Sequence, residues 1–189
     1  WTRPTRRTGP TRLRHPTGRV ADRVAVRPFI PYDDRRLHSA AEPVGAITDA
    51  VRAVWDDMVH TMEAMPGMGL AAPQIGVMLR LAVVDASDRR GEVVRMANPE
   101  VLHASARMRA HDEASPNLPG VSAVIERPRA VTVRFLNDRG EVEDRDFVGL
   151  WATSVQHQID HLNGRVYVDH LSALKRRMLV AKSSKLSRR

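Results

Sequence analysis

Residues 156–161 carry the side chains of this 189-residue chain whose types and spacing could do chemistry. His157 and His161 are four residues apart, so on a helix their ring nitrogens lie on one face and can converge on one metal ion. The spacing alone is a weak signal, because a pair of core or surface histidines has it too. In the hydrolytic form of this pattern, HExxH, the first His is followed by a Glu that takes a proton from metal-bound water. Here that position is Gln158.

A helix over residues 149–162 must position these histidines. Apolar residues recur along it at helical spacing, and Asn163 and Gly164 end it. A second long helix is predicted over residues 47–65, with Thr48 or Asp49 as its cap and Pro66 and Gly67 after its end.

Alternating and apolar segments predict strands over residues 79–84, 93–97, 130–136 and 141–148, the last two joined by a hairpin at residues 137–140. Pro28 makes residues 25–30 an edge strand or an extended arm. Without a βαβ rhythm, the pattern predicts an α+β fold of antiparallel strands around two long helices.

The chain has no cysteine, which excludes disulfides, iron–sulfur clusters and thiolate ligands. Any metal must therefore bind His or oxygen ligands. No apolar run approaches the 18 or so residues that span a bilayer, and no signal-peptide core follows the basic amino terminus. We therefore expect no membrane partner and no secretion.

The net charge of +8 is confined to the two ends of the chain: residues 1–23 carry +6 and residues 175–189 carry +7, which leaves −5 for the rest. Residues 1–22 are predicted to be a disordered basic tail. This tail is a product of processing, an upstream start that is not the natural one, or a basic arm.

The predicted domain covers residues 23–182, and residues 183–189 form a second basic tail. Before this tail, a helix over residues 171–182 is expected to dock through one apolar face. The face consists of Leu171, Leu174, Met178 and Leu179. Its basic end is either a solvated surface or a surface that meets ribosomal RNA phosphates.

From about residue 24 to residue 182 the chain resembles the peptide deformylase family, whose three ordered motifs are GxGxAAxQ, EGCxS and HExDH. Residues 67–74 (GMGLAAPQ) match the first fully, residues 113–117 (EASPN) match the second in part, and residues 157–161 (HQIDH) match the third except at Gln158. The resemblance implies a hydrolase that removes the formyl group from formyl-methionyl nascent peptides. It also implies a divalent metal, usually Fe(II) and replaceable by Zn or Ni, held by the motif Cys and the two His.

The departures fall on the catalytic positions. Ser115 replaces the Cys ligand, so the remaining site at His157 and His161 is expected to hold metal weakly. Gln158 replaces the Glu that moves protons. Pro116 lacks the backbone N–H that, by resemblance, stabilises the oxyanion beside Gln74. We therefore expect a deformylase-like protein whose activity is strongly impaired or absent.

The alternative is a non-catalytic member that binds peptides or ribosomes. By resemblance, Gly67, Gly69 and Gln74 keep the loop that pairs with an extended peptide, although the glycines could serve only turn geometry. Asn117 either faces a ligand or is a loop residue without a role.

His103 and His111 do not occupy the position of the missing ligand, and we interpret them as surface residues of a strand. We also expect a monomer in the bacterial cytoplasm. An organelle transit peptide is disfavoured, because the basic tail has no apolar face.

Overall fold

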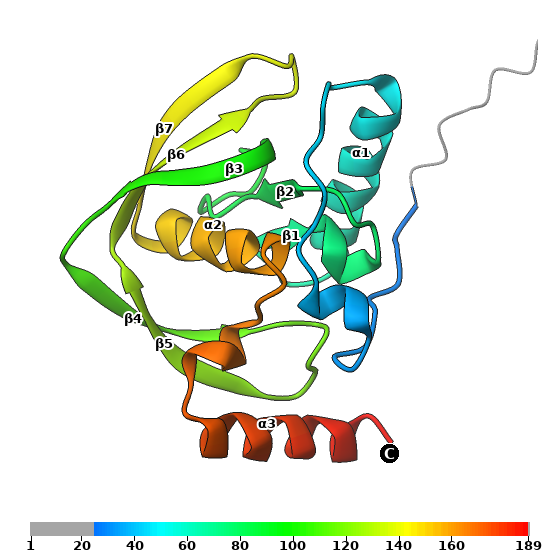
Figure 1. Ribbon diagram of the computed structural model, residues 1–189, viewed down its shortest axis with the longest axis vertical. Helices are drawn as coiled ribbons and strands as arrows, with labels where there is room; N and C mark the ends of the chain where they lie inside the picture. The colour runs from blue at the N-terminus through cyan, green and yellow to red at the C-terminus, as the bar shows by residue number, and fades with distance from the viewer. Residues whose placement is uncertain (1–24, 189) are drawn as a thin grey trace, which may run out of the picture.

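The computed structural model describes residues 25–188 (Figure 1). The predicted disordered tail, residues 1–22, lies outside the described residues. The helices are α1 (Asp49–Glu63), α2 (Gly149–Leu162) and α3 (Ala173–Leu186), with short 3-10 turns at Arg35–His38, Ala72–Ile75 and Tyr167–His170. The strands are β1 (Gly69–Ala71), β2 (Leu81–Val84), β3 (Val94–Ala104), β4 (Met108–Ala114), β5 (Ser122–Pro128), β6 (Ala130–Leu136) and β7 (Val142–Val148).

The strands form two antiparallel sheets. One has five strands in the order β1-β2-β3-β6-β7, and the other pairs β4 with β5. Helix α2 lies between the two sheets, and α1 packs against β1 and β2 (Figure 1). This arrangement confirms the predicted α+β fold. Within residues 25–188, no helix is both long and apolar enough to cross a membrane.

Helix α1 forms as its sequence predicts. The Thr48 hydroxyl caps its start by accepting a hydrogen bond from the Val51 N–H at 3.3 Å. Its apolar stripe is buried against β1 and β2 and includes Val51, Trp55, Met58 and Met62. Burying this stripe gives the helix its tertiary stability.

Helix α2 has the predicted bounds and ends in a turn that requires glycine. Gly164 has φ +72°, and a Cβ there would lie 2.8 Å from the backbone of His38 and Ser39. The inner face of the helix packs on the five-stranded sheet through Val155, Ile159 and Leu162. The histidine segment is therefore held between two sheets.

Three strands were not predicted from the sequence: β1, β4 and β5. β1 has only three residues, while β4 and β5 carry many charged residues and lack a clear apolar alternation. Residues 25–30 form the extended arm rather than a strand. The backbone N–H groups of Ala25 and Arg27 donate to the side chains of Asp57 and Thr61 on α1.

The docking face of α3 differs from the prediction. Leu174 and Met178 are 62% and 64% exposed. Leu171 and Leu179 of the predicted face do pack, together with Val180, and the Ser183 hydroxyl donates to the Pro119 carbonyl at 2.7 Å. Because the helix begins at Ala173 and continues to Leu186, its buried face includes Ser183 and turns Leu174 and Met178 toward solvent.

Candidate functional site

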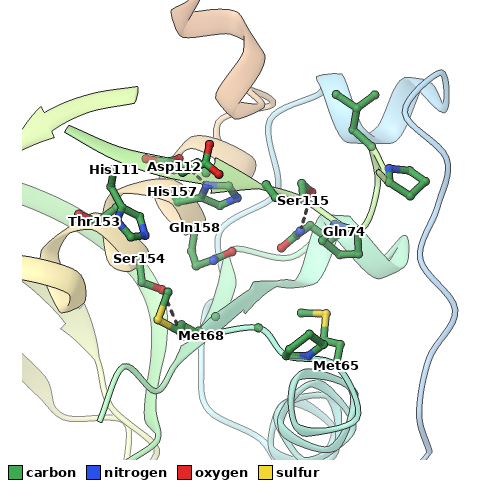
Figure 2. Close-up of a pocket in the computed structure, with 18 of the residues that line it drawn as sticks. Met65, Met68, Gln74, His111, Asp112, Ser115, Thr153, Ser154, His157 and Gln158 are labelled. Carbon is green, nitrogen blue, oxygen red and sulfur yellow. Dashed lines mark hydrogen bonds and ion pairs between the residues drawn. The ribbon is translucent and has the colours of Figure 1, made fainter. Parts of the chain in front are cut away.

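A cavity of about 450 Å³ opens between α2, the end of β4 and the loop that leads into β1. Its wall contains His157 and Gln158 from α2, Ser115 from the segment after β4, and Gln74 from the 3-10 turn after β1 (Figure 2). Residues from the three motif segments, 67–74, 113–117 and 157–161, therefore meet in the wall of one cavity.

His157 is held by a buried carboxylate. Its Nδ1 donates to Glu113 Oε2 at 2.7 Å, and because an ionised carboxylate only accepts, the proton is on Nδ1. Burial raises the pKa of Glu113, but hydrogen bonds from His157 and Arg127 outweigh it, so the pKa falls to about 2. The Nε2 of His157 is left as the ring nitrogen that can bind a ligand.

His161 is fully buried, and neither of its ring nitrogens has a hydrogen-bond partner within the described residues. Burial and the neighbouring His157 lower its pKa well below the ordinary value. The ring is therefore neutral and keeps a lone pair. The centroids of the two imidazole rings are 5.0 Å apart. Unpaired buried polar atoms are rare in proteins. The two imidazoles are therefore suited to act together as ligands of one bound group.

Ser115 is 4% exposed and belongs to a closed cluster of hydrogen bonds. Gln74 Nε2 donates to Ser115 Oγ at 3.3 Å and to Asn117 Oδ1 at 3.0 Å. The Ser115 hydroxyl donates to Asn117 Oδ1 at 3.1 Å. Asn117 Nδ2 in turn donates to the carbonyls of Ile30 and Gln74. Asn117 thus has a structural role, and the Ser115 proton is directed at it.

Gln158 is buried, and its Oε1 has no hydrogen-bond partner within residues 25–188. The helix approaches β1 closely at this point: a Cβ on Gly69 would lie 2.6 Å from Gln158 Nε2 and 2.7 Å from Ser154 Oγ. Neither Gly67 nor Gly69 is among the glycines with positive φ. Gly69 is therefore required by close packing and not by turn geometry.

The donor set matches the implied metal site only in part. The imidazoles of His157 and His161 suit a transition metal, but Ser115 offers a neutral hydroxyl, which is a poor ligand compared with a thiolate. Within the described part of the chain, no group of three His, Asp or Glu side chains could hold a metal ion. The residues present therefore do not fit the three-ligand site that the resemblance implies.

Several site residues were missed or misplaced by sequence reasoning. His111 was interpreted as a surface residue, but it lines the cavity, whereas His103 is exposed as expected. Thr153 and Ser154 also line the cavity, one helical turn before His157 and Gln158. A pattern of i and i+4 positions on α2 could have identified them. Arg127 pairs with Glu113, a contact between β5 and β4 that requires the tertiary fold.

The chain is similar to a known family in both sequence and structure. The family model "Polypeptide deformylase" matches residues 26–177. The chain is 41% identical to peptide deformylase 1 of Burkholderia multivorans over 165 residues, covering 87% of this chain and 91% of that protein.

Solved structures agree with the sequence comparison. The crystal structure of a peptide deformylase from Legionella pneumophila superposes with a TM-score of 0.82 at 37% identity, covering 87% of this chain and 96% of that one. A Met-Ala-Ser-bound peptide deformylase from Acinetobacter baumannii gives a TM-score of 0.74 at 30% identity, covering 78% of this chain and 99% of that one.

Proposed function

The chain belongs to the peptide deformylase family, and from this membership we propose that it keeps the family's peptide groove while its hydrolytic activity is strongly impaired or lost. The observation that carries the proposal is the position of Ser115. Its hydroxyl is buried in the cluster with Gln74 and Asn117, at the place where the family motif has a Cys.

Loss of the thiolate weakens metal binding. A thiol has an ordinary pKa of about 8.5 and ionises readily beside a metal, whereas a serine hydroxyl stays protonated. Structural zinc sites are worth about 10–16 kcal/mol, so one ligand of four contributes roughly 3 kcal/mol, or about 100-fold in affinity. The imidazoles of His157 and His161 alone are expected to hold Fe(II), Ni(II) or Zn(II) weakly.

Gln158 removes the proton carrier. A side-chain amide does not take up and return a proton near neutral pH, and general acid–base catalysis is typically worth about 10²–10⁴ in rate. The position is intact as a contact, because Gln158 is buried beside Gly69. The carboxylate that could exchange a proton is absent from this position.

Pro116 removes a hydrogen-bond donor. Proline has no backbone N–H, and loss of one oxyanion donor costs about 10²–10³ in rate. Gln74 Nε2, the other donor implied by the family, is directed at Ser115 and Asn117. The missing N–H at Pro116 and the missing proton carrier at Gln158 together lower the rate by at most about 10⁴–10⁷. This product is an upper bound because both groups act on one transition state.

The groove itself supports peptide binding. Among the described residues, β1 lies at the edge of its sheet and pairs with β2 alone. An edge strand beside a cavity can accept an extended peptide as an added strand. In the solved relative from Acinetobacter baumannii, the bound molecule is the peptide Met-Ala-Ser. We propose the amino-terminal end of an extended peptide, formyl-methionyl by family, as the ligand class.

The exposed side of α3 supports a second partner. Lys175, Arg177, Lys182 and Lys185 are all solvent-exposed on this helix. Ribosomal RNA would attract such a surface through its phosphates. We therefore propose ribosome docking through α3 as the alternative role of a non-catalytic member.

Turnover and binding of formyl-Met-Ala-Ser test the proposed function. The full chain is purified anaerobically, supplied with Fe(II) or Ni(II), and assayed beside the Burkholderia multivorans relative. We expect a kcat/KM lower by about 10⁴ or more, with peptide binding that Gly69→Ala weakens and Gly45→Ala does not. A Cβ at Gly45 meets nothing within 4 Å, which makes it a matched control. Turnover within about tenfold of the relative overturns the proposal.

A further inference from the structure

The loop between β2 and β3 is closed around one buried carboxylate. Asp85 is 2% exposed. Its oxygens accept hydrogen bonds from the Ser87 hydroxyl and from the backbone N–H groups of Ser87, Gly91 and Glu92. Four hydrogen bonds to one side chain fix the path of the loop, so the residues between Ser87 and Gly91 are presented in a defined orientation.

Arg90 has an unusual backbone conformation in this loop. Its φ is +58°, in the left-handed region that residues other than glycine rarely adopt. Its Nη1 donates to the Gly67 carbonyl at 2.7 Å and to the Asp85 carbonyl at 2.9 Å. Strained positions of this kind persist where the surrounding structure holds them, and they cluster at functional sites. At Arg90 the strained backbone accompanies a contact with a segment outside the loop.

Gly67 is the residue that this contact holds. It lies between the end of α1 and the start of β1, and it lines the cavity. A glycine restricts the backbone less than any other residue, so its conformation depends on the hydrogen bonds that it makes. The Gly67 N–H donates to the Met65 carbonyl at 2.8 Å, and its carbonyl accepts from Arg90. Arg90 therefore helps to fix the direction in which the chain enters β1.

The next carbonyl along the chain is also held within the protein. The Met68 carbonyl accepts from the Asp85 N–H at 2.9 Å and from the Ser154 hydroxyl at 3.1 Å. Asp85 thus contributes twice, because its backbone N–H holds Met68 and its side chain shapes the loop that places Arg90 on Gly67.

The free edge of β1 begins directly after these two residues. Gly69 lies opposite Val84 in the antiparallel pairing with β2. Two residues further on, the Ala71 N–H donates to Gln74 Oε1 and not to β2, so Ala71 faces the free edge. Facing toward and away from the neighbouring strand alternates along an antiparallel strand, so the N–H and carbonyl of Gly69 also face the free edge. These are groups with which an added strand pairs.

Resting on the peptide-binding function above, we propose that Arg90 is a positioning residue for peptide binding. By holding the Gly67 carbonyl two residues before Gly69, it aligns the free edge of β1 with the cavity. Arg90 itself does not line the cavity, so it acts through the backbone of residues 67–69 and not by contact with the peptide.

Calorimetric binding of formyl-Met-Ala-Ser amide to the full chain tests this role. The amidated end leaves no carboxylate for an arginine to attract. Arg90→Asn removes the guanidinium but keeps a residue that tolerates the left-handed backbone. We expect the peptide to bind about five- to tenfold more weakly to this variant. Arg90→Lys keeps one cationic donor and should recover part of the loss. Arg89→Asn removes the same charge from the exposed neighbouring residue and should leave binding unaltered.

Two further measurements distinguish positioning from a general loss of stability. Arg90 and Arg89 are both exposed, so the free energies of urea unfolding of the two asparagine variants should be similar. Hydrogen exchange of the Asp85 N–H reports on its bond to the Met68 carbonyl, which joins β2 to the start of β1. This exchange should be several-fold faster in Arg90→Asn and unaltered in Arg89→Asn.

The outcomes separate this inference from the proposed function. Equal peptide binding by Arg90→Asn and the unmodified chain overturns the inference and leaves the peptide groove in place. An equal loss of binding in Arg89→Asn assigns the effect to charge and also overturns the inference. Weaker binding by Arg90→Asn with unaltered exchange at the Asp85 N–H shows that Arg90 does not act through β1. Absence of peptide binding by the unmodified chain overturns both proposals.

Discussion

Glu113 accepts a hydrogen bond from the Nδ1 of His157 at 2.7 Å, and it does so as part of a buried ionic chain. Arg127 donates to both Glu113 oxygens, at 2.6 and 2.9 Å, and reaches Asp160 at 2.8 Å. Asp160 also contacts His170 at 2.6 Å. This chain joins β4, β5 and α2 and fixes the orientation of the His157 ring. The His157 ring is therefore fixed beside Ser115 and Gln158 in the wall of the cavity.

Arg127→Met is expected to destabilise the protein by about 3–5 kcal/mol, because Glu113 and Asp160 would remain buried without their cation. Urea unfolding provides the measurement. The matched control is Arg134→Met, which breaks an exposed pair with Asp144 and should cost about 0–1 kcal/mol. Equal losses of unfolding free energy in the two variants would contradict a special role for the buried ionic network.

The same carboxylates predict how stability depends on pH. The pKa of Glu113 and that of Asp160 are each lowered to about 2; burial opposes the shift, but hydrogen bonds to His157 and Arg127, and to His170 and Arg127, outweigh it. A lowered folded-state pKa contributes stability above the ordinary value of about 4 that is lost as pH falls toward 2. Unfolding free energies between pH 5 and pH 2 should therefore fall steeply, and less steeply in Glu113→Gln. Parallel slopes in the two proteins would count against this assignment.

Ser115→Cys is expected to raise metal occupancy. The unmodified protein, purified anaerobically, should carry well under one equivalent of Fe, Ni or Zn, and the added thiolate should increase affinity by about 100-fold. Elemental analysis after dialysis against a chelator gives the readout. Ser184→Cys, at an exposed position on α3 away from the cavity, is the control. Stoichiometric, chelator-resistant metal in the unmodified chain would point to a third ligand that the donor set described above does not contain.

Restoring one altered position should recover little deformylation. Ser115→Cys, Pro116→Leu and Gln158→Glu concern a ligand, an oxyanion donor and a proton carrier that act on a single transition state, so their effects are not additive. The triple variant should exceed the product of the single gains. Formyl-peptide turnover across all eight combinations, with metal content measured in each, tests this. A folded, metal-loaded and inactive triple variant would place the divergence in the peptide groove.

Neutralising α3 should weaken binding to purified ribosomes. Glutamine in place of Lys175, Arg177, Lys182 and Lys185 removes four exposed charges without disturbing the buried contacts of Leu179 and Ser183. Each lost phosphate contact should reduce the salt dependence of binding, with a slope change of about one per contact. The control replaces four exposed arginines elsewhere with glutamine: Arg89, Arg107, Arg139 and Arg145. An equal loss in both variants would indicate nonspecific attraction by net charge.

The sequence alone was sufficient to predict the helices α1 and α2 and to identify the family. Local signals fix these features: the Thr48 cap and apolar stripe of α1, the Gly164 turn after α2, and three ordered motifs whose residues are close in the chain. The altered residues Ser115 and Gln158 were identified for the same reason, because each occupies a motif position.

The tertiary structure decided what these residues contact. The hydrogen bonds of Ser115 to Gln74 and Asn117, the pairing of Arg127 with Glu113, and the need for glycine at position 69 all join segments far apart in the chain. The same is true of His111, which lines the cavity with Thr153 and Ser154 only after β4 and α2 pack together. Periodicity reports which face of an element is buried, but the partner across that face is chosen by packing of the whole chain.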